Sequence, residues 1–415
     1  MNRIVSTCQQ DAKVIHEYWS SVGGRMDSVR ENELLGYCTN VHPCRSLDDV
    51  GRMLAEQAAA VRDQCGFDIA VGLWLPASAM ADVAADPGAI DRLRGWLAEC
   101  RFSCHTLNAF PFGDFHSERV KEQVYLPDWA DARRLDYTRA CTRLLAGILP
   151  AGTDGSISTL PLGFKQAERS ADFLDRAIAQ LLSLTRDLSQ LQQETGRTIR
   201  LAIEPEPFCL LETTAETIAF FEQLWQAAAA SGCARAAREH LGVCYDVCHQ
   251  AVEFEDAATA VGQLKAAGIR INKVQISCAI ELDQPADPEA RRALASFAEA
   301  RYLHQTFARQ ADGGVTRAAD LTETLALHPP ADWQTAETWR VHFHVPVDAE
   351  RLGPLSTTRA ELVRALAAIG QLPYRPHLEV ETYTWPVLPG VTAGDVTAGL
   401  ARELIATRTL LEHAS

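Results

Sequence analysis

Five polar residues have types and positions that suit a divalent metal site: Glu204, Asp246, His249, Gln275 and Glu381. Each stands at or just past the carboxyl end of a short apolar segment that predicts a buried β-strand. Carboxylate oxygen, amide oxygen and imidazole nitrogen are ligands that Mn²⁺, Co²⁺, Zn²⁺ or Mg²⁺ accept. If these side chains meet at one point, they predict a metal-dependent enzyme or a metal-binding protein derived from one.

The elements that must position these residues are apolar segments separated by helix-length stretches. The predicted strands are Tyr37–Val41, Ile69–Leu75, Ser103–Phe110, Ser156–Leu162, Ile199–Glu204, Leu241–Asp246, Ile271–Ser277 and His377–Thr382. Because a helix-length stretch follows each of them, the pattern predicts an α/β protein with parallel strands inside and helices outside. Eight such units close a (β/α)8 TIM barrel, which leaves no exposed edge strand.

Alternation along these strands indicates which way the polar side chains point. In the fifth strand, Leu201 and Ile203 share one face, and Glu204 lies on the other. In the sixth strand, Tyr245 is likewise opposite Asp246. The seventh and eighth strands show the same pattern at Gln275 and Glu381. Since apolar faces pack outward against helices, the polar residues are expected to point into the barrel mouth.

The chain divides into an amino-terminal extension and one large domain. Residues 1–30 lack clear periodicity and predict a flexible extension, and residues 31–415 predict a single TIM-barrel domain. An insertion at about residues 283–350, between strands seven and eight, interrupts the alternation. It is expected to contain the helix Pro288–Glu299, a small hairpin formed by Arg301–Ala308 and Gly314–Ala319, and the strand Trp339–Val347. The insertion is a candidate for either a lid or a partner surface.

Composition excludes several classes of function. The formal net charge of −15 argues against nucleic acid as the main partner. No apolar stretch reaches the roughly 18–20 residues that cross a bilayer, so direct membrane insertion is not expected. The 12 cysteines form no CxxC pair, which favours reduced thiols in a cytoplasmic protein. Motifs for nucleotide cofactors or a serine nucleophile are also missing from the sequence.

The strand endings IEPEP, DVCH and LEVET resemble the xylose isomerase-like (AP endonuclease family 2-like) TIM barrel superfamily. The longer segments GYCTNVHP, TLNAFPFGDFH, SISTLPLG, YDVCH, HFHVP and LEVETYTWPVLP resemble the narrower family of the metabolite traffic protein EboE. That resemblance covers about Leu35 to Leu411. The EboE resemblance implies a role in secondary-metabolite traffic, with other proteins of the same operon as possible partners.

The superfamily resemblance implies roles for individual residues. Glu204 and Glu381 would be the catalytic acid/base pair, and the metal ligands would be Glu204, Asp246, Gln275, Glu381 and His249. Gln275 stands where the superfamily usually has a histidine, which weakens that ligand. The candidate substrate-binding residues are His344, His342, Asn40, His42, Asn108, His116 and Glu379. Four other histidines, His16, His240, His328 and His413, are expected at the surface.

Three functional hypotheses follow. The first is a metal-dependent isomerase or epimerase that acts on a small polyhydroxylated or carbonyl metabolite. The second is a metal-dependent hydrolase or phosphoesterase of the endonuclease IV-like branch. It is disfavoured because strands two and three end in LWLP and LNAFPFG, without the histidines of that branch. The third is a non-catalytic, metabolite-binding component of an export pathway.

Overall fold

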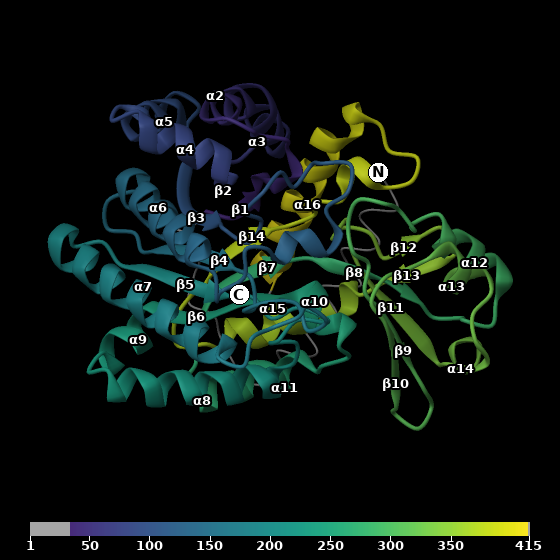
Figure 1. The fold of residues 1–415 in the computed structure, drawn as a ribbon. Helices are drawn as coiled ribbons and strands as arrows, with labels where there is room; N and C mark the ends of the chain where they lie inside the picture. Colours follow the sequence, from purple (N-terminus) through teal and green to yellow (C-terminus); the bar gives the residue numbers. More distant parts are fainter. Residues whose placement is uncertain (1–33, 414–415) are drawn as a thin grey trace.

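The computed structural model describes residues 34–413, and its centre is a closed barrel of parallel strands (Figure 1). The barrel strands are β1 Gly36–Cys38, β2 Ala70–Trp74, β3 Ser103–Asn108, β4 Gly155–Thr159, β5 Ile199–Ile203, β6 Leu241–Asp246, β7 Ile271–Ile276 and β14 His377–Val380. Their order around the barrel is β1-β14-β7-β6-β5-β4-β3-β2. The predicted (β/α)8 fold is confirmed. The predicted extension, residues 1–30, lies outside the described residues.

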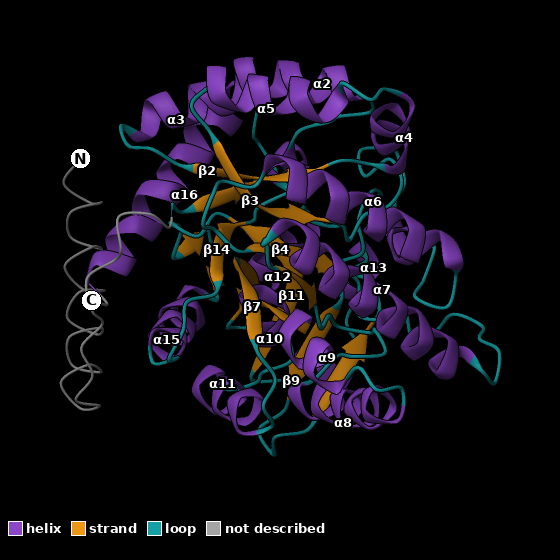
Figure 2. Cartoon of the chain, turned by 90° about the vertical axis from the view of Figure 1, so that its left-hand side faces the viewer, coloured by secondary structure: helices purple, strands orange, loops and turns teal. Residues whose placement is uncertain are grey.

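Helices cover the outside of the barrel (Figure 2). They are α2 Leu47–Arg52, α3 Ala59–Cys65, α4 Ala77–Ala85, α5 Ala89–Glu99, α6 Ala132–Ile148, α7 Phe173–Thr195, α8 Thr214–Ala230, α9 Ala234–His240, α10 Val247–Val252, α11 Ala257–Ala266, α15 Arg359–Gly370 and α16 Ala393–His413. The local sequence explains where several of these helices begin or end. A capping box of Thr213 and Glu216 begins α8, and Gly196, at φ 70°, ends α7.

A second sheet lies beside the barrel (Figure 1). Its strand order is β10-β9-β11-β8-β13-β12. The elements of this region are β8 Cys278–Leu282, α12 Pro288–Ala295, β9 Thr306–Arg309, β10 Val315–Ala318, α13 Glu323–Leu327, α14 Ala331–Gln334, β11 Thr338–Val345, β12 Arg351–Leu352 and β13 Leu355–Thr357. The expected hairpin corresponds to β9 and β10, but it is part of a larger sheet. The sequence did not reveal β8, because CAIEL follows β7 almost without a break.

The loop between β3 and α6, residues 109–131, joins the barrel to this second sheet. It contains the short 3-10 helix η3, Lys121–Tyr125. The backbone N–H groups of Val120 and Lys121 both donate to the carbonyl of Arg301, at 2.8 Å. The Lys121 ammonium also forms an ion pair with Asp320, at 2.7 Å. These contacts hold the loop against the inserted region.

A buried carboxyl pair also joins the two parts, and it gives the fold a pH dependence. Glu253 and Glu212 both lie within reach of Arg317 on β10, at 3.3 Å and 3.2 Å. Burial, and then the Glu212 charge, raise the pKa of Glu253 to about 10. The folded state therefore binds this proton more tightly than the unfolded state, where the pKa is about 4.3. The stability that the group contributes is full below about pH 4 and is lost as the pH rises towards about 10.

We therefore expect Glu253→Gln to stabilise the protein increasingly as the pH rises from 5 to 8. The expected gain over the wild type grows by about 1 kcal/mol per pH unit. Urea unfolding at each pH measures it, and Glu222→Gln, at an exposed position on α8, is the matched control. A difference between the Glu253→Gln variant and the wild type that does not change with pH would contradict this expectation.

Candidate metal centre and active site

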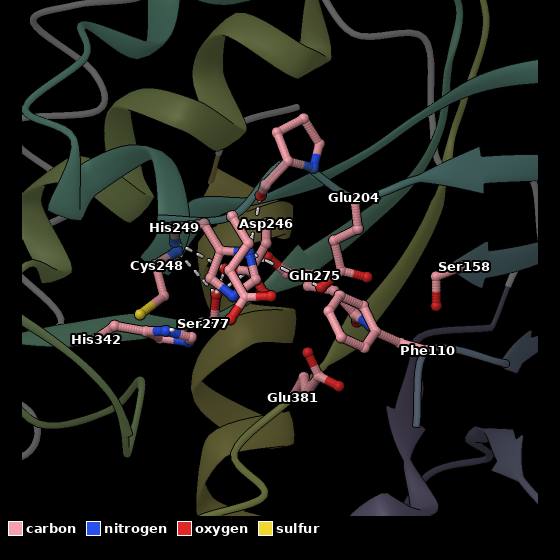
Figure 3. A network of polar contacts seen from close by, with 12 residues as sticks. Phe110, Ser158, Glu204, Asp246, Cys248, His249, Gln275, Ser277, His342 and Glu381 are labelled. Atoms are coloured by element: carbon pink, nitrogen blue, oxygen red, sulfur yellow. Dashed lines mark hydrogen bonds and ion pairs between the residues drawn. The ribbon is translucent and has the colours of Figure 1, made fainter. Parts of the chain in front are cut away.

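Acidic side chains from three barrel strands meet at the carboxyl ends of those strands (Figure 3). Glu204 follows β5, Asp246 ends β6, and Glu381 follows β14. One carboxylate oxygen from each lies within 4.8 Å of the others. All three residues are buried. Three carboxylates this close repel one another unless they bind protons or a cation.

Further groups of potential cation ligands adjoin these three carboxylates. In each group, one ligand atom per residue lies within 4.8 Å of the others. The groups are Asp246 with His249 and His344; Glu206 with His249 and His342; and Cys248 with His342 and His344. Asp246 thus belongs both to the carboxylate group and to an imidazole group, so it lies at the centre of the site.

The local fold around Asp246 fixes the carboxylate and the neighbouring imidazole together. Asp246 is the N-cap of α10, and its Oδ1 accepts from the backbone N–H of His249, at 3.0 Å. The Ser277 hydroxyl donates to the same oxygen, at 2.8 Å. The other oxygen, Oδ2, is buried and has no hydrogen-bond partner among the described residues. Asp246 thereby begins the short helix on which His249 lies.

Backbone carbonyls fix the protonation of two histidines. His249 Nδ1 lies 3.0 Å from the Pro205 carbonyl, and His344 Nδ1 lies 2.7 Å from the Glu381 carbonyl. Because a carbonyl only accepts, each Nδ1 must carry the proton, which leaves a lone pair on Nε2. Both Nε2 atoms lie 3.8 Å from Asp246 Oδ2. A hydrogen bond from the opposite ring nitrogen is how proteins orient a metal-binding imidazole.

The third imidazole, His342, is fixed by Gln305. The Gln305 amide nitrogen donates to the Pro207 carbonyl, at 3.2 Å, so its Oε1 is the atom that accepts from His342 Nδ1, at 2.7 Å. His342 Nε2 is then a lone-pair nitrogen, and it is buried without a hydrogen-bond partner among the described residues. Three neighbouring imidazoles therefore all present a bare Nε2.

Two asparagine side chains hold Glu381 in place. Asn40 and Asn108 both donate to Glu381 Oε1, at 2.8 Å and 2.9 Å. Asn40 lies just past β1, and Asn108 ends β3. The strand next to β14 and a strand two places beyond it thus orient one oxygen of the carboxylate. These two asparagines line the cavity, but their side chains are directed at Glu381.

Burial and charge set the protonation of the site. Burial, and then the charges of Glu381 and Asp246, raise the pKa of Glu204 well above its usual value. Burial, followed by the charge of Asp246, raises the pKa of Glu381 to about 8. Burial lowers the pKa of His249 to about 4 and also lowers those of His342 and His344. The neutral imidazoles suit cation binding, and the raised pKa values of the two glutamates suit proton transfer.

Glu206 is a site residue that the sequence interpretation missed. It accepts from the Tyr125 hydroxyl, at 2.6 Å, and its other oxygen is buried without a hydrogen-bond partner among the described residues. Burial raises its pKa to about 8. The available signal was the spacing in IEPEP, which puts Glu206 two residues after Glu204. Tyr125 and Gln305 carry no comparable signal, because they reach the site from a loop and from the second sheet.

An ion pair lies inside the barrel, below the carboxylates. Lys273 on β7 lies 2.6 Å from Glu379 on β14, and neither side chain is exposed to solvent. Glu379 extends past β1 to Gly72 on β2, where an added Cβ would lie 1.3 Å from its Oε1. Glycine is therefore required on β2. Glu379, a predicted substrate-binding residue, is placed in this internal pair and does not line the cavity.

The cavity at the site has a volume of about 50 Å³. Its lining combines carboxylates with aromatic side chains. The aromatic members of the lining are Phe110, Phe115, Tyr125, Tyr302 and Tyr383, and the predicted residues in it are Asn40, Asn108, Glu204, His249, His342 and Glu381. We call this space the inner cavity.

Other predicted residues lie around the inner cavity or away from it. Gln275 is buried beside Asp246, and both of its amide atoms lack a hydrogen-bond partner among the described residues. His42 contacts the Tyr37 hydroxyl at 3.3 Å, and His116 contacts the Asn40 carbonyl at 2.8 Å. Neither histidine lines the inner cavity.

Of the four histidines expected at the surface, one prediction was wrong. His240 is fully buried, because its Nδ1 is hydrogen-bonded to the Ile199 carbonyl at 2.8 Å. His328 is exposed as expected. His16 and the side chain of His413 lie outside the described part of the chain. The 11 cysteines within the described residues are unpaired.

The fold is a TIM barrel similar to that of a solved xylose isomerase-like protein. A xylose isomerase-like TIM barrel protein from Mycobacterium smegmatis, in complex with magnesium, matches with a TM-score of 0.51. The identity is 12%, over 92% of this chain and 98% of that chain. An L-ribulose 3-epimerase has a TM-score of 0.47 and 14% identity, over 92% of this chain and 95% of that chain. No family model and no curated protein matches the sequence.

A further solved structure similar to this chain is an IolI protein with a bound zinc atom. Its TM-score is 0.35, with 11% identity over 57% of this chain and 70% of that chain. Within the described residues, none of the helices has the length and apolar character needed to cross a bilayer.

Proposed function

We propose that this protein is a metal-dependent isomerase or epimerase that moves a proton next to a carbonyl group of a small oxygenated metabolite. The convergence of Glu204, Asp246 and Glu381 on one point is the observation that carries the proposal. The likeness to the magnesium complex of the xylose isomerase-like barrel adds support.

The residues fit a divalent cation. Asp246 Oδ2, Glu204 Oε2 and His344 Nε2 are buried acceptor atoms without a hydrogen-bond partner in the described structure. Leaving such atoms unpaired costs free energy, and a cation would satisfy them together. Glu204, Asp246 and Glu381 would hold the ion, with His249 and Gln275 beside them. The mixture of oxygen and nitrogen ligands favours Mn²⁺, Co²⁺ or Zn²⁺, and Mg²⁺ is compatible with the three carboxylates alone.

The chain's own residues then supply the acid and the base. When bound, the cation would stabilise negative charge that develops on the substrate oxygen. Glu204 and Glu381 approach the cluster from opposite sides of the barrel mouth, so one can remove a proton from carbon and the other can return one to the opposite face. Asn40 and Asn108 hold Glu381 in position. The aromatic wall limits the access of water.

Proton exchange with solvent tests this proposal. Metal-free protein is loaded with Mn²⁺ in D₂O and incubated separately with D-ribulose, L-ribulose, D-fructose and D-tagatose. We expect deuterium to appear on the carbon next to the carbonyl of at least one ketose, as measured by NMR. The failure of every ketose to exchange, by a protein that demonstrably binds Mn²⁺, would contradict the proposal for this substrate class.

A second candidate function is metal-dependent hydrolysis. Asp246, His249 and His344 form an imidazole-rich group that shares Asp246 with the carboxylate group, and two-metal hydrolases use neighbouring sites that share a ligand. Hydrolysis of bis-p-nitrophenyl phosphate by the Zn²⁺-loaded protein, without ketose exchange, would favour this function.

The biological setting is proposed from sequence motifs alone. We include in the proposal membership of the EboE family, a role in secondary-metabolite traffic, a cytoplasmic location and partners encoded in the same operon. The segments YDVCH and LEVETYTWPVLP, which suggest that family, contain Asp246, His249 and Glu381. The proposed setting and the proposed chemistry therefore depend on some of the same residues.

A further inference from the structure

A second, larger cavity adjoins the inner cavity. Its volume is about 440 Å³. We call it the outer chamber; its walls include Tyr125, Leu126, Phe164, Ala167, Leu303 and Ala319. Lys121, Tyr125 and Leu303 line both spaces, so they form the partition between them. The outer chamber is built from the β3–α6 loop, the segment after β4 and the inserted region.

The two volumes differ in what they can hold. One water molecule needs about 10–15 Å³ of such space, so the inner cavity, at about 50 Å³, has room only for a few water-sized groups. Sites for metabolites and drug-sized ligands usually measure about 300–1,000 Å³. The outer chamber, at about 440 Å³, falls within that range. If the reacting end of a substrate lies against the carboxylates, most of its volume must lie elsewhere.

The walls of the outer chamber indicate the chemistry of that larger part. Phe164 stacks on Tyr125, with ring centroids 4.9 Å apart and an angle of 10° between the planes. Leu126 is 46% exposed, which is unusual for a large apolar side chain in this protein. An apolar or aromatic group placed in the chamber would cover these surfaces.

The charged residues of the chamber are already satisfied. Lys121 is paired with Asp320, at 2.7 Å, and Arg119 with Glu122, at 3.8 Å. The Arg169 guanidinium donates to the Phe164 carbonyl, at 2.6 Å. Because the cations are engaged and an equal number of carboxylates line the chamber, the wall does not favour a phosphate group. A neutral, partly apolar group fits it better.

Tyr125, which lines both spaces, contacts residues of the site and of the outer chamber. The Tyr125 hydroxyl donates to Glu206, whose carboxylate lies among the ligand groups, while the ring of Tyr125 contacts Phe164 in the outer chamber. Gln305 donates to the same hydroxyl, at 3.0 Å, and also orients His342. One tyrosine thus separates the two spaces and touches both.

We propose that the outer chamber is the distal subsite for an elongated, amphipathic substrate. The small oxygenated end would lie in the inner cavity, and an apolar or aromatic group would lie against Phe164 and Leu126. This inference rests on the proposed function, because it takes the inner cavity as the place of reaction. Within the class of ketoses and hydroxyketones, it makes those that carry an apolar substituent the preferred substrates.

Two synthetic ligands with the same reactive end test the inference: 1-hydroxybutan-2-one and its 4-phenyl derivative. Calorimetry measures the dissociation constant of each with the wild type, in the presence and absence of Mn²⁺. Burial of a phenyl group is expected to strengthen binding by at least about tenfold. In Ala167→Trp, where the new side chain fills the chamber, we expect the two affinities to become similar. Ala229→Trp, at an exposed position on α8, is the matched control and should keep the preference.

The outcomes separate this inference from the proposed function. Equal affinity of the wild type for both ligands would overturn the inference, as would tighter binding of the 4-phosphate derivative than of the phenyl derivative. If the Ala167→Trp variant still binds the phenyl ligand more tightly, the inference is also wrong. Ala319→Trp, which fills the outer chamber from a different lining residue, repeats this test. If the wild type prefers the phenyl ligand but neither binds Mn²⁺ nor exchanges a ketose proton, the proposed function is wrong. The apolar subsite is then still supported.

Discussion

Replacement of Lys273 by Met is expected to lower the free energy of unfolding by about 3–5 kcal/mol, because it leaves a buried carboxylate without its partner. Lys273 and Glu379 are both inaccessible to solvent, and their charged atoms lie 2.6 Å apart. The positive charge of the lysine also partly offsets the rise in the pKa of both Glu204 and Glu381. Urea unfolding in metal-free buffer measures the loss.

Two further variants isolate the cause of that loss. Lys273→Met combined with Glu379→Gln removes both charges and should recover at least half of the stability. Lys265→Met, at an exposed position on α11, makes the same substitution at the surface and should change stability by less than about 0.5 kcal/mol. A loss below about 1 kcal/mol for the single Lys273→Met variant would contradict the assignment of a buried, functional ion pair.

Loss of either proposed acid/base residue should have the largest effect on activity. For Glu204→Gln and Glu381→Gln, at saturating Mn²⁺, we expect the rate of deuterium exchange into the reactive ketose to fall by about 10²–10⁴-fold. The amide keeps the shape of the side chain but cannot take up the proton. Exchange is followed by NMR, and metal content is measured in the same samples, so that loss of the ion and loss of the base are distinguished.

The matched control for this experiment is Glu99→Gln, at an exposed position on α5. This variant should catalyse deuterium exchange at the wild-type rate. Exchange that continues at the wild-type rate in both site variants would exclude Glu204 and Glu381 from proton transfer. If only one of the variants loses exchange, the reaction uses a single glutamate that removes and returns the proton on the same face.

The sequence was sufficient to predict the barrel because its signals are local. Each strand is a short apolar segment, and alternation within the strand places Glu204, Asp246 and Glu381 on the inner face. The parallel topology then brings residues that are distant in the chain to the same rim. The fold and the convergence of these three carboxylates could therefore be predicted without coordinates.

Other features depend on contacts that have no local signal. Tyr125 and Gln305 reach the site from a loop and from the second sheet, and only the tertiary structure brings them next to Glu206. Lys273 was overlooked because a lysine in a strand is usually exposed, whereas here Glu379 stabilises it inside the barrel. His240 was misassigned for a similar reason, since the Ile199 carbonyl satisfies it internally.

The most direct test of the account is the metal affinity of protein purified without a chelator and then stripped of metal. Calorimetric titration with Mn²⁺ and with Zn²⁺ is compared between the wild type and Asp246→Asn, whose folding is checked by circular dichroism. We predict stoichiometric binding to the wild type, and binding at least about tenfold weaker to Asp246→Asn, because Asp246 belongs to two of the ligand groups. The same sub-stoichiometric uptake by both proteins would contradict the claim that these side chains form a cation site.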